Sequence, residues 1–186
     1  MRLFVAVNLP DEVRHALWEA AAPARRPDPP VRWVRPDGMH LTLKFLGEVE
    51  PTRESEIGDA IELAAAGARP FTLRIEGFGV FPNASRPRVI WAGCEPVPQL
   101  EVLQHRVEQE MERLGFPLEG RPFRPHLTLG RARDGAPPAR LAAVAEALEE
   151  LTYSADVVVR SVDLMESQLS AAGARHTRRQ AATLGA

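Results

Sequence analysis

The sequence is poor in the features that mark exported, membrane-spanning or nucleotide-driven proteins. It has one cysteine, Cys94, so no disulfide can form within the chain and no zinc knuckle can be built. No apolar run approaches the roughly 20 residues that cross a bilayer. The N-terminal segment turns acidic after one short apolar run, unlike a signal peptide, and no GxxxxGK(S/T) motif is present. We therefore expect a cytoplasmic protein with no membrane partner.

Lysine is almost absent as well. Lys44 is the only lysine among 23 basic residues, and the formal net charge is −2. A chain with a negative net charge is not a basic coat for nucleic acid. The excess of arginine fits a GC-rich genome. Arginine also suits planar, bidentate phosphate contacts, but that interpretation first requires a site.

Segments with strand and helix patterns are interleaved along the 186 residues. Period-two alternation and runs of strand-forming residues predict strands at 2–9, 31–35, 40–46, 71–81 and 88–94, from 126, at 154–169 (one or two strands) and, as an edge strand, within 170–184. Helices are predicted after Pro10, at 52–68, at 100–114 and after Pro138. Strand-turn-strand pieces favour antiparallel pairing, so we predict an α+β architecture with two similar halves.

The word His-Leu-Thr-Leu occurs twice, at His40 and at His126, about half the chain apart. Residues two apart on a strand share a face, so His40 points with Thr42 and His126 points with Thr128, while the leucines enter the core. If the halves are related lobes, both pairs can face one cleft. A pair of hydrogen-bonded histidines on half-buried strands is the plainer alternative, but the matching contexts favour a shared site.

Two histidines and two threonines around one point suit phosphoryl transfer. Imidazole has an ordinary pKa near 6.5, so one neutral and one protonated ring can act as general base and general acid. Threonine hydroxyls can donate to the charged oxygens of a phosphate. The facing ring nitrogens should be on the order of 6 Å apart. Neither motif is surrounded by a metal-ligand pattern, so we expect no metal and no cofactor.

Several segments around these motifs resemble the two-histidine (2H) phosphoesterases, and among them the LigT-like RNA 2′,3′-cyclic phosphodiesterases, once called 2′-5′ RNA ligases. The resemblance covers most of the chain. The similar segments occur in the family's order: RLFVAVNLP, RWVRPDGMHLTLKFLGEV, GFGVFPNASRPRVIWAGC, FRPHLTLGRAR and SQLSAAGARHT.

The resemblance implies that residues 1–186 form one bilobal α+β domain with pseudo-twofold symmetry. Each lobe would hold an antiparallel sheet with helices packed outside, around a central cleft. The implied reaction opens a terminal 2′,3′-cyclic phosphate on RNA, such as a tRNA fragment, to a 2′-phosphate. By family analogy His40 would be the proton donor, His126 the proton acceptor, and Thr42 and Thr128 the phosphate-binding residues. We expect a monomer.

Two alternatives stay open. The enzyme could act on another cyclic nucleotide or a 2′-5′ linkage, or join RNA ends. The chain could instead be a non-catalytic RNA-binding module. The sequence departs from the family at His176, where a tyrosine is common, which puts any role carried over to that position in doubt.

Other residues near the motifs are assigned by alternation and composition. Lys44 is expected on the face of His40, as a strand-end residue or a phosphate contact, and Arg131 on the face away from His126 unless a bulge intervenes. A positive lip for RNA or a solvated tail could be formed by Arg175, Arg178 and Arg179.

Core packing is expected for Trp33, Phe81 and Trp91, although Trp33 and Phe81 could stack on a base. Surface or boundary positions are expected for His15 and His105.

Overall fold

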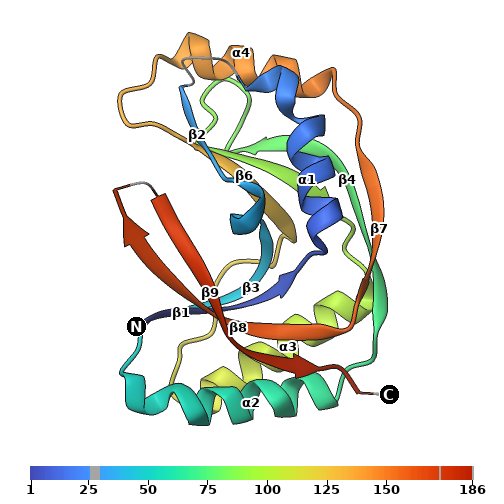
Figure 1. Ribbon diagram of the computed structural model, residues 1–186, viewed down its shortest axis with the longest axis vertical. Coiled ribbons are helices and arrows are strands. Elements are labelled where there is room, and N and C mark those ends of the chain that lie inside the picture. The colour runs from blue at the N-terminus through green and yellow to red at the C-terminus, as the bar shows by residue number, and fades with distance from the viewer. Residues whose placement is uncertain (26–29, 172, 186) are drawn as a thin grey trace.

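The computed structural model describes residues 1–25, 30–171 and 173–185, and one curled antiparallel sheet runs through them (Figure 1). The strands are β1 (Arg2–Asn8), β2 (Val31–Trp33), β3 (His40–Glu48), β4 (Phe71–Phe81), β5 (Val89–Cys94), β6 (His126–Ala132), β7 (Ser154–Val159), β8 (Ser161–Ser170) and β9 (Gly173–Thr183). Their order is β7-β4-β5-β6-β3-β1-β8-β9, and β2 pairs with β6. The α+β prediction and the predicted C-terminal edge strand are both confirmed.

Four α-helices and three short 3-10 helices connect the strands: α1 (Asp11–Ala20), η1 (Ala22–Ala24), η2 (Pro36–Gly38), η3 (Pro51–Arg53), α2 (Glu54–Ala66), α3 (Pro98–Arg113) and α4 (Pro138–Glu149). Figure 1 shows α2 and α3 at one end of the molecule, near β8 and β9, and α1 and α4 at the other. Within the described ranges, no helix combines the length and the apolar character that a membrane crossing requires.

The two halves of the sheet meet at a single residue pair. One half is β3, β1, β8 and β9, and the other is β6, β5, β4 and β7 with β2 added. Between β3 and β6 the only recorded pair of described residues is Leu41 with Leu127. The two expected sheets are therefore joined edge to edge, and the join lies inside the repeated word.

A large apolar core lies behind the leucines of the two motifs. Leu41 and Leu127 belong to the same buried cluster as residues from all four α-helices. The predicted stripe of α3 accounts for much of it, because Leu100, Leu103 and Met111 are fully buried. Burial of each such side chain contributes about 1.5–3 kcal/mol. This packing holds β3 and β6 in place, with the leucine side facing the helices.

A β-bulge interrupts β3 at the second leucine of its motif. The partners of Thr42 and Lys44 are consecutive residues of β1, so Leu43 is the extra residue. Leu43 and Lys44 are consequently both buried, and Phe45 is 66% exposed. The expectation that Lys44 shares the face of His40 is wrong, because the bulge turns its side chain toward α3, where it pairs with Glu108.

The second motif has a bulge at the same place. In β6 the partners of Thr128 and Gly130 are consecutive residues of β5, so Leu129 is extra. Leu129 and Gly130 are both buried, and Arg131 is exposed. Strict alternation alone would put Arg131 on the far face, but the bulge, which was the stated exception, returns it to the face of His126.

Candidate active site

The repeated word brings four polar side chains onto one face of the sheet: His40, Thr42, His126 and Thr128. We call this side the histidine face. Because β3 and β6 are antiparallel and pair at the first leucine of each word, each histidine lies across from the threonine of the other motif. The two histidines are diagonal neighbours, a relation with a backbone spacing of about 7–8 Å. The ring-nitrogen separation near 6 Å stays a prediction, and this spacing is compatible with it.

The ring of His40 is half-buried in a small aromatic group. Its centroid lies 4.7 Å from that of Phe4 on β1 and 4.9 Å from that of His176 on β9, the second contact being edge-on at 81°. A ring N–H donates to the carbonyl of Gly38 in η2. Burial, and then the charge of His176, lower the pKa of His40 from its ordinary 6.5 to about 4.

The ring of His126 is fixed in a parallel way. Its Nδ1 lies 2.7 Å from the carbonyl oxygen of Arg124. A carbonyl can only accept, so Nδ1 donates and Nε2 is left for the histidine face. The ring stands edge-on to Phe81, with centroids 5.2 Å apart at 89°. Both histidines are thus held by a backbone carbonyl two residues earlier and by one phenylalanine ring.

Phe81 and Trp91 lie on the histidine face rather than in the core. Neither belongs to the core cluster or packs against it, although Trp33 does as expected. Their rings are 5.2 Å apart. Gly79 makes room for the indole, because a Cβ at that position would lie 2.2 Å from the Trp91 ring. Core packing was the wrong expectation for Phe81 and Trp91, since alternation alone does not tell which face of a strand is solvated.

A polar group that sequence reasoning missed adjoins β1. Asn8 donates to Asp163 Oδ2 at 2.6 Å, and Arg178 lies 3.9 Å from the same oxygen. Asp163 is almost fully buried, its Oδ1 has no partner among the described residues, and burial raises its pKa. The only signal in the sequence was one aspartate inside the apolar run SVDLM.

Strand β9 places His176 beside His40, but two of its arginines are paired with carboxylates and do not form a free positive surface. Arg179 makes two hydrogen bonds to Glu54 of α2, at 2.8 and 2.9 Å, and Arg178 faces Asp163. Arg175 is exposed. Two of the three arginines are therefore engaged within the fold.

His176 is half-buried between Phe4 and His40, and its Nδ1 has no partner among the described residues. Burial lowers the pKa of His176, and the charge of Asp37 opposes that shift. His15 and His105 are exposed on α1 and α3, as expected of surface residues.

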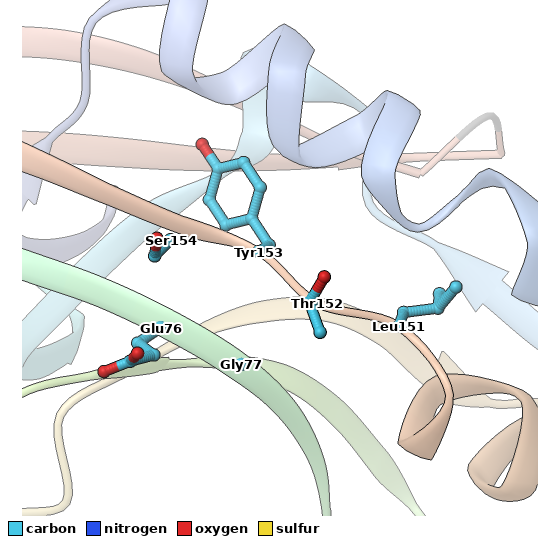
Figure 2. Close-up of a pocket in the computed structure, with 6 residues that line it drawn as sticks. All are labelled: Glu76, Gly77, Leu151, Thr152, Tyr153 and Ser154. Carbon is cyan, nitrogen blue, oxygen red and sulfur yellow. The ribbon is translucent and has the colours of Figure 1, made fainter.

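A shallow cavity of about 340 Å³ lies away from the motifs, between β4 and the start of β7. Figure 2 shows its lining side chains pointing in different directions, with Tyr153 turned to α1, where its hydroxyl donates to the Val13 carbonyl at 3.4 Å. None of the four motif residues lines it. Over residues 1–25, 30–171 and 173–185, no three His, Cys, Asp or Glu side chains are arranged to hold a metal ion.

Acid is expected to destabilise the protein through His40. Between pH 6.5 and about 4 the unfolded chain binds a proton that the folded ring does not. The free energy of unfolding should fall as the pH is lowered through this window, by on the order of 3 kcal/mol from this residue. Thermal unfolding at pH 7 and at pH 4.5 measures the change. The His40→Gln variant should lose less stability than the parent, and an equal loss in both would contradict the assignment.

The fold is that of the LigT-like two-histidine phosphoesterases. The family model of the 2′-5′ RNA ligase superfamily matches residues 9–170, and the chain belongs to that superfamily.

Sequence and structure matches to other proteins support this family assignment. The chain is 32% identical over 177 residues to an RNA 2′,3′-cyclic phosphodiesterase of Methanothermobacter thermautotrophicus, covering 95% of each chain. It is 43% identical to one of Thermus thermophilus over 74% of this chain and 71% of that one. It matches a Geobacillus stearothermophilus relative of the same name at 35% identity, spanning 43% of that protein's length. A solved structure of a Thermus thermophilus protein superposes with a TM-score of 0.83 at 32% identity, covering 99% and 98% of the two chains.

Proposed function

We propose that the protein hydrolyses a terminal 2′,3′-cyclic phosphate on RNA to a 2′-phosphate without a metal ion. The observation that carries the proposal is the pairing of β3 and β6 inside the repeated word, which makes two histidines diagonal neighbours on one face. The relatives named RNA 2′,3′-cyclic phosphodiesterase support the substrate. A solved Escherichia coli relative, 29% identical with a TM-score of 0.75, is described in complex with 3′-AMP.

In the proposed reaction His126 acts as the base. Its Nε2 takes a proton from water, and the resulting oxygen attacks phosphorus on the side opposite the 3′ oxygen. The P–O3′ bond breaks, and His40 gives its proton to the departing O3′, which leaves a 3′ hydroxyl and a 2′-phosphate. Thr42 and Thr128 donate hydrogen bonds to the non-bridging oxygens, where negative charge builds up.

His40 is expected to become protonated when the substrate binds. In the free protein the pKa of this ring is about 4, so it is neutral at pH 7. An anionic phosphate placed against the ring favours the charged form and raises its pKa. Substrate binding would thereby convert His40 into an acid only where the acid is needed.

A cyclic-phosphate oligonucleotide incubated in the presence of a chelator tests the proposal. The expected product carries a 2′-phosphate and a free 3′ hydroxyl. A 3′-phosphate product would contradict the regiochemistry, and activity that is lost with the chelator and returns with added metal would contradict metal independence. Salt-sensitive binding without turnover would instead indicate a non-catalytic RNA-binding module. Joined ends would indicate a ligase.

A further inference from the structure

A third imidazole lies against His40, although it comes from a strand that is not a neighbour of β3. In the sheet, β9 is separated from β3 by β8 and β1, so the contact depends on the curl of the sheet. The ring centroids of His176 and His40 are 4.9 Å apart, and the rings meet edge-on at 81°. Phe4 contacts both rings, with centroids 5.2 Å from His176 and 4.7 Å from His40. The two imidazoles therefore share one aromatic environment.

His176 also lies against the segment that holds His40. A Cβ on Gly38 would lie 3.9 Å from His176 Nδ1, and the Gly38 carbonyl accepts the hydrogen bond of the His40 ring. His176 Nδ1 is itself buried and has no hydrogen-bond partner among the described residues. Since no hydrogen bond fixes a proton on this nitrogen, the surrounding charges decide the protonation state of His176.

The charges next to the two rings favour a proton on His176 over a proton on His40. Two imidazoles at this distance repel each other when both are charged, so they titrate as a pair. Burial lowers the pKa of both rings. The charge of Asp37 in η2 favours the charged form of His176, whereas the charge of Arg14 in α1 disfavours the charged form of His40. On acidification His176 therefore takes the first proton.

The other charged or titratable groups on this face do not reverse that order. They are Arg2 of β1, His126 of β6, Asp163 of β8 and Arg178 of β9. Asp163 and Arg178 face each other at 3.9 Å, so their charges largely offset. Arg2 is exposed, and solvent screens its charge. A proton on His126 would add a like charge and would disfavour a proton on His40 further.

We propose that His176 is a positioning residue for His40: it takes the first proton of the pair, and its charge keeps His40 neutral until an anionic phosphate reaches the site. The phosphate offsets the repulsion between the two rings, so that both can then be charged. The inference rests on the proposed function, in which His40 is the acid, and refines it by naming the residue that controls when this acid forms. His176 itself transfers no proton to the substrate.

An NMR titration of the free protein tests the proposal. The ring Cε1–H signal of His40 is identified by its absence in His40→Gln. His176→Phe and His176→Tyr keep an aromatic ring and remove the charge, so in both variants His40 should titrate at a pH higher by about one unit. The inflection of kcat/KM at about pH 4 that follows His40 should move by the same amount. The matched control is His105→Phe, which replaces an exposed imidazole on α3 and should leave the titration of His40 unchanged.

A ring that only packs against His40 predicts no shift in either variant, and that result would overturn the proposal. A shift in one variant alone, or a shift to lower pH, would overturn it as well. If neither variant folds, the parent protein decides: the signal of His176 must change before that of His40 on acidification, and the opposite order rejects the proposal.

Turnover of a cyclic-phosphate oligonucleotide by the parent protein tests the proposed function separately. Without turnover the proposed function fails, and the titration still decides whether His176 controls the protonation of His40.

Discussion

Replacing His40 or His126 by alanine is expected to lower kcat for the cyclic-phosphate oligonucleotide by about 10²–10⁴, the usual contribution of one general acid or base. In the proposed reaction, His126→Ala removes the group that takes the proton from water, and His40→Ala removes the group that protonates the 3′ oxygen. Single-turnover hydrolysis at saturating substrate measures both losses without interference from binding. The double variant should be little worse than the single ones, because residues that act as a unit are not additive.

The control for these variants is His105→Ala, which changes an exposed imidazole on α3 far along the chain from both motifs. Its activity and its thermal unfolding should match those of the parent. Because His40 is half-buried against Phe4 and His176, His40→Gln should be compared with His40→Ala to separate loss of chemistry from loss of packing. Near-parental kcat in either alanine variant would remove that histidine from the mechanism.

Removing the charge of Lys44 is expected to destabilise the fold by about 3–5 kcal/mol, since it leaves a buried carboxylate unpaired. The side chains of Lys44 and Glu108 are only 4% and 8% exposed, and their charged atoms are 2.7 Å apart. Lys44 also donates to the Pro117 carbonyl at 2.8 Å. Glu108 accepts further hydrogen bonds from Gln104 and from the Glu119 backbone N–H. The pair thereby ties β3 and α3 to the segment that leads into the second motif.

Lys44→Met is the variant to measure, by urea unfolding at pH 7. The double variant Lys44→Met/Glu108→Leu should recover most of the loss, because replacing both charges with apolar groups leaves none unpaired. The exposed pair of Arg113 and Glu110 on the same helix provides the contrast, and Arg113→Ala should cost less than about 1 kcal/mol. A Lys44→Met protein as stable as its parent would show that the buried pair contributes little.

The order of elements and the inward leucines could be predicted because both depend on local periodicity. The apolar stripe of α3 illustrates this. Apolar residues at helical spacing lie on one face of the helix, and that face is buried as expected. Leu41 and Leu127 follow the period of a strand in the same way. Such patterns need no knowledge of which strands become neighbours.

The presence of the bulges that decide the faces of Lys44 and Arg131 could not be predicted from the sequence. A bulge depends on how the neighbouring strand pairs, and a single extra residue reverses every later side chain. The same holds for Asp163 and His176, which reach β1 and His40 only through the pairing of β8 and β9. Phe81 and Trp91 show the same limit, since alternation tells which residues share a face but not which face is solvated.

The sequence by itself determined the class of fold, the order of the helices and strands, and the sharing of one strand face by each His-Thr pair, because these follow from side-chain type and spacing along the chain. Only the tertiary structure decided that the motif strands pair with each other, that both are bulged at the same leucine, and that His176 of β9 lies against His40. Those features depend on contacts between residues far apart in sequence, which local periodicity does not specify.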